Sequence, residues 1–168
     1  LSSCIQEALL QCKYLCTQAS MSIRFPEQDA LVYTDEKWLT YIISQILSNS
    51  IKYHRTKDAC IKISAAHTGS SVSLILEDNG RGIPAADLPR VFEKGFTGTV
   101  RTNRQSTGMG LYLCRKLCLK LGLSIRADSV CGEGTKITID FPTGTYVRNK
   151  ALQFCKYKNT LSPAMITS

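Results

Sequence analysis

Three polar side chains stand at a spacing that brings them together on a helix. Gln45, Asn49 and Lys52 occupy positions i, i+4 and i+7, so a helix carries all three on one face. An amide oxygen suits Mg²⁺, and a lysine one turn further along suits a phosphate group. Seen alone, such a stripe is more often the exposed polar side of an amphipathic helix.

A second cluster follows an expected strand directly. Residues 78–83 read Asp-Asn-Gly-Arg-Gly-Ile, and the two glycines permit a ligand to approach the backbone closely. Asp78, held at the end of that strand, could accept a hydrogen bond from an exocyclic amine. The competing interpretation is an ordinary Asp-Asn-Gly turn with no ligand.

A third cluster is rich in glycine and opens an expected helix. Residues 107–111 read Thr-Gly-Met-Gly-Leu, which leaves backbone N–H groups and the positive end of the helix dipole facing outward. Such a helix start is a ready anion site. A single Gly-x-Gly pattern is nevertheless weak evidence.

Hydrophobic periodicity predicts the elements that position these clusters. Apolar side chains at steps of three and four predict helices over residues 4–19, from about Asp35 to residue 51, and over 110–121. The second of these helices would be capped by Thr34 or Asp35. A shorter helix is expected over residues 85–91. Alternating patterns predict strands over residues 22–25, 60–66, 72–77, 124–129 and 136–141. This order favours an α+β fold, a two-layer α/β sandwich whose one mixed, mostly antiparallel sheet has helices packed on one face.

Two segments lack such periodicity. Residues 97–107 are rich in threonine and contain Arg101 and Arg104, which predicts a long, mobile loop. After Pro142 the pattern dissolves, so residues 144–168 are expected to be a partly disordered tail.

Composition narrows the class of protein. The chain has 168 residues, 43% of them hydrophobic, which fits one domain with its own core. A net charge of +8 could indicate a nucleic-acid partner, but the charge is dispersed. A basic surface with a nucleotide site that needs cations is therefore favoured, and no nucleic-acid partner is expected.

Cysteine spacing and chain ends add context. Cys12/Cys16 and Cys114/Cys118 are four apart within apolar helices, where cysteine acts as a small hydrophobe more often than as a zinc ligand. Free buried thiols indicate a reducing cytosol. No run approaches the ~20 apolar residues of a membrane span. Because the first residue is Leu1, we expect a fragment whose missing part could hold a membrane anchor.

The order and spacing of the three clusters resemble the N, G1 and G2 boxes of the ATPase superfamily of histidine kinases, gyrase, Hsp90 and MutL. Residues 92–96, Phe-Glu-Lys-Gly-Phe, are similar to the F box that precedes the ATP lid. The resemblance covers residues 1–143. Within the superfamily, residues 47–53, 91–98 and 106–113 resemble small sensor kinases of Firmicutes that respond to bacitracin and cationic peptides and act with an ABC transporter.

The resemblance implies roles for individual residues. Asn49 would be the Mg²⁺ ligand and, with Lys52 on the phosphates, would form the catalytic pair. Tyr53 would lie against the adenine or sugar, and Asp78 would read the adenine amino group. The flexible lid would be residues 97–107, with Arg101 and Arg104 as candidate phosphate cations. The cofactors would be ATP and Mg²⁺, held by Asn49, Lys52, Tyr53, Asp78, Gly80, Gly82, Ile83, Thr107, Gly108, Met109, Gly110 and Leu111.

Gln45 separates functions within the superfamily. Members that hydrolyse ATP carry a glutamate there to activate water, whereas an amide has no useful basicity. This favours a domain that donates the γ-phosphate of ATP to a histidine, here outside the chain, because His54 and His67 are expected to be surface residues. The alternatives are a water-using ATPase or ATP-gated clamp, and a degenerate interaction module; the intact motifs argue against the latter.

The resemblance also implies a context for the domain. Residues 1–19 would lead in from a dimerisation and phosphoacceptor segment, residues 20–143 would form the ATP-binding catalytic domain, and residues 144–168 the tail. The expected partners are that segment, a homodimer partner, a cognate response regulator and the transporter. The expected location is the cytoplasmic side of a membrane-anchored kinase.

Overall fold

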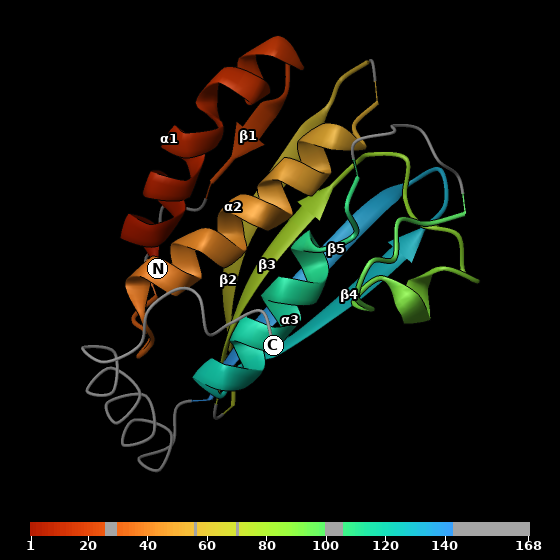
Figure 1. Ribbon diagram of the computed structural model, residues 1–168. Helices are drawn as coiled ribbons and strands as arrows, with labels where there is room; N and C mark the ends of the chain where they lie inside the picture. Colours follow the sequence, from red (N-terminus) through yellow and green to blue (C-terminus); the bar gives the residue numbers. More distant parts are fainter. Residues whose placement is uncertain (26–29, 56, 70, 100–105, 143–168) are drawn as a thin grey trace.

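The computed structural model describes residues 1–25, 30–55, 57–69, 71–99 and 106–142, and in this part of the chain three α-helices cover one face of a five-stranded sheet (Figure 1). No helix of the described residues is long and apolar enough to cross a membrane. The elements in chain order are α1 (Ser2–Gln18), β1 (Ser22–Arg24), α2 (Glu36–Lys52), β2 (Cys60–Thr68), β3 (Ser71–Asp78), the 3₁₀ turn η1 (Leu88–Arg90), α3 (Gly110–Leu121), β4 (Ser124–Val130) and β5 (Gly134–Pro142).

The sheet is mixed and mostly antiparallel, which confirms the predicted α/β sandwich. Its strand order is β1-β2-β3-β5-β4, and only β1 and β2 run parallel. Ile63 of β2 pairs with Leu76 of β3, which in turn pairs with Ile137 of β5. All three are buried, because alternate residues of each strand face the helices.

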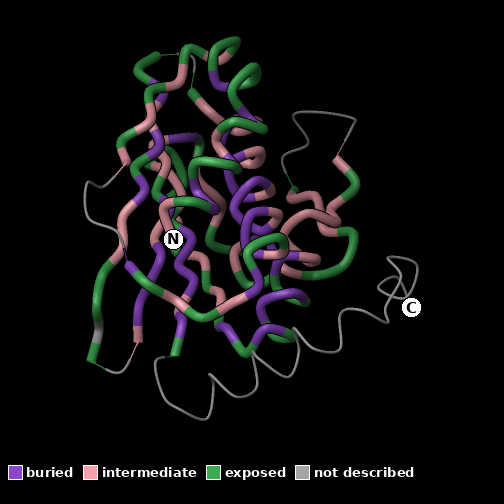
Figure 2. Tube along the Cα trace, turned by 90° about the vertical axis from the view of Figure 1, so that its left-hand side faces the viewer, coloured by how far each residue is buried: buried purple, intermediate pink, exposed green. Residues whose placement is uncertain are grey.

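Helix α2 lies between α1 and α3 and packs against both (Figure 1). Its broad apolar stripe is therefore part of the common hydrophobic core. Figure 2 colours the buried residues of the chain purple. Of the two predicted caps, Asp35 is the one that caps the helix, since its Oδ1 accepts a hydrogen bond from the Trp38 N–H at 3.0 Å. The cap fixes the start of α2, and its last turn carries the candidate residues Asn49 and Lys52.

The helix predicted over residues 85–91 is wrong. Only Leu88–Arg90 forms a single 3₁₀ turn, flanked by other turns. Pro89 lacks the N–H group that a longer helix would donate to the Ala85 carbonyl, so the segment cannot continue a regular hydrogen-bond ladder. Of the predicted lid, residues 100–105 with Arg101 and Arg104 lie outside the described residues, as does the tail over residues 144–168.

The described cysteines are free thiols, and those on the helices are buried, as predicted. Cys12 and Cys16 of α1, like Cys114 and Cys118 of α3, face the core and act as small apolar side chains. Burial raises the pKa of the Cys118 thiol to about 12, and it raises the pKa of Cys114 further still. Both thiols therefore stay protonated in the folded chain when they would ionise in the unfolded one.

We expect the free energy of unfolding to fall as the pH rises above the pKa of an ordinary thiol. A raised pKa contributes stability that is complete below the unfolded value, about 8.5, and is lost as the pH climbs towards the folded value. Each such thiol should cost about 1.4 kcal/mol per pH unit in that window. Urea unfolding followed by Trp38 fluorescence from pH 7 to 10.5 measures the slope. Cys118→Ala should make the free energy of unfolding fall less steeply with pH, whereas Cys131→Ala, at an exposed position, should leave that slope unchanged. Equal slopes in the two variants would contradict the contribution assigned to the Cys118 thiol.

Candidate nucleotide-binding site

The end of α2 meets the start of α3. A Cβ added at Gly110 would lie 3.1 Å from Gln45 Oε1 and 3.8 Å from Asn49 Nδ2. The predicted first and third clusters therefore adjoin, and glycine leaves the space between them open. Met109 provides no side-chain cap for α3, so the first turn presents its N–H groups without that partner. Such a helix start, beside Lys52 and an amide oxygen, suits a phosphate group and its metal ion.

The Asp78 carboxylate is fixed at the end of β3 by donors from three places in the chain. Its Oδ1 accepts hydrogen bonds from the Gly80 N–H at 2.9 Å and the Thr135 N–H at 3.2 Å. Its Oδ2 accepts one from the Ser50 hydroxyl at 2.7 Å. Ser50 and Thr135 were not predicted, because these partners lie 28 and 57 residues from Asp78. The bonds orient the carboxylate before any ligand arrives.

Gly82 and Gly80 are required by close packing of the protein itself. Gly82 has a φ of +68°, and an added Cβ would lie 2.0 Å from the Val130 carbonyl oxygen. An added Cβ at Gly80 would lie 2.8 Å from both Asp78 Oδ1 and the Tyr53 carbonyl oxygen. The glycines thus let the 78–83 turn lie against the end of α2 and against the β4–β5 turn. Together these contacts set the position of Asp78.

Lys52 and Tyr53 converge on one hydroxyl group. The Lys52 ammonium donates a hydrogen bond to Ser106 Oγ, and the Tyr53 hydroxyl lies 3.3 Å from the same oxygen. The ammonium also lies 5.5 Å from the centre of the Tyr53 ring. Ser106 directly precedes the Thr107–Leu111 cluster, which is the one signal by which the sequence marks it. The three residues join the end of α2 to the segment that leads into α3.

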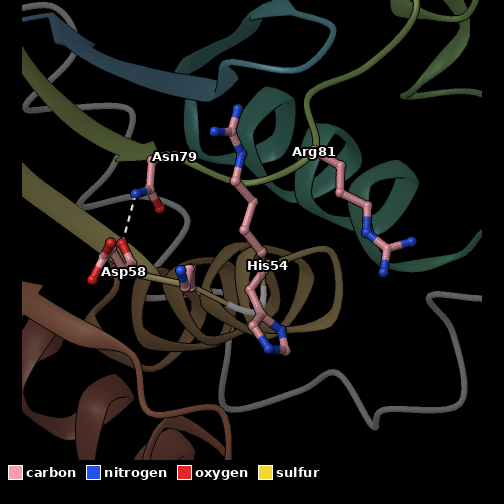
Figure 3. Close-up of a pocket in the computed structure, with 6 residues that line it drawn as sticks. His54, Asp58, Asn79 and Arg81 are labelled. Atoms are coloured by element: carbon pink, nitrogen blue, oxygen red, sulfur yellow. Dashed lines mark hydrogen bonds between the residues drawn. The ribbon is translucent and has the colours of Figure 1, made fainter.

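A hollow beside the 78–83 turn gathers basic side chains (Figure 3). Asn79 lines this hollow and joins two segments beside it. Its Oδ1 accepts a hydrogen bond from the Cys60 N–H at 2.8 Å, and its Nδ2 donates one to the Asp58 carbonyl at 2.7 Å. Arg55 Nε donates to the Gly80 carbonyl at 3.1 Å. Asn79 and Arg55 therefore brace the turn that carries Asp78. The residues that line the hollow are His54, Arg55, Lys57, Asp58, Asn79 and Arg81.

The remaining residues singled out in the sequence differ in their exposure and in their contacts. Ile83 follows the turn, where its N–H donates to Ser129 Oγ at 2.8 Å. Leu111 packs its side chain against the hydrophobic core, whereas Thr107 is exposed. His67 is exposed, as expected, but His54 is only partly exposed, with Nδ1 2.5 Å from the Ile51 carbonyl oxygen. The roles of these residues towards a nucleotide stay predictions.

Fold and site together define the class of protein. A mixed sheet covered by helices on one face carries, at one end, a fixed carboxylate, a polar helix face and an open helix start, an arrangement suited to ATP. Residues 34–145 match the family of histidine kinase-, DNA gyrase B- and HSP90-like ATPases, and the chain belongs to that family.

The relatives narrow the class. The sensor histidine kinase GraS of Staphylococcus haemolyticus is 47% identical over 112 residues, which cover 66% of this chain and 32% of that protein. The chain thus spans far less than the full length of that curated relative. The likeness to histidine kinases, and among them to sensor kinases of Firmicutes, is confirmed.

Solved structures agree on the fold. The mycobacterial sensor histidine kinase MprB has a TM-score of 0.73 at 22% identity, covering 84% of this chain and 94% of that one. The histidine kinase ThkA, in its complex with the response regulator protein TrrA, has a TM-score of 0.68 at 20% identity, covering 86% of this chain and 40% of that one.

Gly108→Ala is expected to weaken ATP binding by about tenfold or more. The resemblance implies that Gly108 helps to hold ATP, and hydrogen bonds to a charged group such as a phosphate contribute about 1.5–3 kcal/mol. Gly108 has a φ of +66°, and an added Cβ would lie 2.3 Å from the Gly95 carbonyl carbon, so the segment before α3 must move. Gly122 at the other end of α3 has a similar φ of +73° but nothing within 4 Å of an added Cβ.

Gly122→Ala is therefore the matched control. It should lose about 1–2 kcal/mol of stability through its positive φ and bind ATP normally. Calorimetric titration of both variants with ATP makes the comparison. Equal ATP affinity of the two would remove the segment before α3 from the site.

Proposed function

We propose that the chain is the ATP-binding catalytic domain of a two-component sensor histidine kinase. It holds ATP and presents the γ-phosphate to a histidine in another part of a longer protein. Family membership gives the ATP-binding fold. The observation that carries the kinase assignment is Gln45, whose Oε1 lies 3.1 Å from the Cβ position of Gly110 at the phosphate end. An amide there cannot take a proton from water, so the site holds ATP for another nucleophile.

Asn49 would contribute its amide oxygen to Mg²⁺, which supplies charge neutralisation on the phosphates when bound. No hydrogen bond from this side chain to the described residues is found, so its oxygen has no competing donor there. Lys52 and the N–H groups at the start of α3 would contact the phosphates. In the transfer, the bond from the bridging oxygen to the γ-phosphorus breaks, a histidine nitrogen bonds to phosphorus, and ADP leaves.

The wider setting follows from the relatives. A histidine-bearing dimerisation segment, a second copy of the protein and a response regulator are the proposed partners. The complex of ThkA with TrrA supports the last of these. A membrane-anchored kinase with this domain on the cytoplasmic side is likewise proposed on the sequence resemblance. An ABC transporter and a response to bacitracin or cationic peptides are proposed on the sequence resemblance.

The division of the chain is also a proposal. Residues 20–143 would be the catalytic domain and residues 144–168 an appendage. Residues 1–19 would lead in from the histidine-bearing segment while packing on the catalytic domain, since Ile5 and Ala8 of α1 belong to the common hydrophobic core.

Nucleotide titration of the chain tests the proposal. We expect ATP binding to depend on Mg²⁺. We expect ATP hydrolysis to be slow, because Gln45 occupies the position of the base that would activate water. Titration calorimetry and a phosphate-release assay measure the two. Failure to bind ATP would refute the kinase assignment, and rapid hydrolysis by the chain alone would favour a water-using ATPase.

A further inference from the structure

Asp87 has a buried carboxylate for which the proposed function gives no role. The residue is 4% exposed and directly precedes η1. Burying a carboxylate costs free energy unless strong hydrogen bonds compensate. Its Oδ2 accepts both the backbone N–H and the hydroxyl of Thr99, each at 2.9 Å. Thr99 lies 12 residues further along the chain, so these bonds tie together the two ends of residues 87–99, which we call the η1 segment.

The tied segment touches the phosphate end of the site through its backbone. The Gly95 N–H donates to the Gly108 carbonyl at 3.1 Å. No side chain separates these backbones, since an added Cβ at Gly108 would lie 2.3 Å from the Gly95 carbonyl carbon. The Arg90 guanidinium lies 4.5 Å over the Phe96 ring and holds the segment to η1. A shift of residues 95–99 therefore moves Gly108, which leads into α3.

The adenine end of the site has separate supports. Asp78 is held by Ser50, Gly80 and Thr135, none of which lies in the η1 segment. Different hydrogen bonds thus fix the two ends. A change at Asp87 should reach the phosphate end and leave the adenine end in place.

We propose that Asp87 is a positioning residue for the phosphate end of the nucleotide site, acting through Thr99 and Gly108. This inference rests on the proposed function. The carboxylate does not touch the nucleotide. It fixes residues 95–99, whose contact with Gly108 sets the direction in which the start of α3 presents its N–H groups.

Titration of the full chain with ATP and, separately, with adenosine tests the proposal. Asp87→Ala should weaken ATP binding about tenfold, the usual effect of losing hydrogen bonds to a charged group, and change adenosine binding less than about twofold. Asp87→Asn keeps an oxygen at the Oδ2 position and should retain most of the ATP affinity. Thr99→Val removes only the hydroxyl and should give an intermediate loss, which keeps the test open if Asp87→Ala does not fold.

The double variant Asp87→Ala/Thr99→Val should bind ATP no more weakly than Asp87→Ala alone, because both changes break the same contact. Parallel loss of ATP and adenosine affinity would indicate a merely structural role and overturn the proposal. So would ATP affinity unchanged in folded variants, or Asp87→Asn as damaging as Asp87→Ala. If the unaltered chain fails to bind ATP, the proposed function fails instead.

Discussion

Asp78→Asn is expected to weaken ATP binding by about tenfold or more while GTP binding stays the same or improves. The hydrogen bonds decide which way the new amide points. The N–H groups of Gly80 and Thr135 both donate to the Oδ1 position, so the amide oxygen must stay there. The amide NH₂ then takes the Oδ2 position, where it would meet the amino group of an adenine read by this side chain, donor against donor. A guanine carbonyl at the same place would accept from it.

Competition binding with ATP and GTP measures the effect. The unaltered chain should bind GTP at least about tenfold more weakly than ATP, because an acceptor would face an acceptor. Ser50→Ala should lower ATP affinity without narrowing that gap, since the carboxylate loses a support but not its charge. Asp140→Asn is the matched control: this carboxylate on β5 is held by Ser73 and Ser124, away from the site. Equal ATP and GTP binding by the unaltered chain would exclude Asp78 as the adenine reader.

Local pattern predicted what local forces decide. The apolar stripe of α2 and its Asp35 cap are set within a few residues, and both are found. The alternating strands place Ile63 and Leu76 on the buried face for the same reason. The single-face sandwich follows because each element has only one apolar side to bury.

The supports of the site could not be predicted in this way. Ser50 and Ser106 are ordinary polar residues by sequence, and their partners are 28 and 54 residues away. By sequence, Asp87 is typical of an exposed carboxylate in a turn, and only the fold places Thr99 within hydrogen-bond distance of it. Motifs therefore located the residues expected to meet the nucleotide, whereas the hydrogen bonds that orient them depend on the tertiary fold. The helix predicted over residues 85–91 was wrong because Pro89 lies inside it and removes one of its backbone hydrogen bonds.

Asn49→Ala is expected to abolish the Mg²⁺-dependent part of ATP binding and to leave the fold intact. Asn49 is only partly buried, and no hydrogen bond from its side chain to the described residues is found, so its loss should cost less than about 0.5 kcal/mol of stability. Its amide lies beside Gly110 at the start of α3, where the proposed phosphate and metal ion would be. Without that oxygen, Mg²⁺ loses a protein ligand.

Calorimetric titration with ATP, in Mg²⁺ and again in a chelator, separates metal binding from nucleotide binding. In chelator the variant and the unaltered chain should bind ATP about equally, whereas in Mg²⁺ only the unaltered chain should gain affinity. Gln18→Ala, an exposed amide on α1 that donates to the Tyr14 hydroxyl, is the matched control and should behave as the unaltered chain does. A loss of affinity in chelator as large as in Mg²⁺ would mean that Asn49 contacts the nucleotide or supports the pocket. A gain in Mg²⁺ that survives the substitution would place the metal ligand elsewhere.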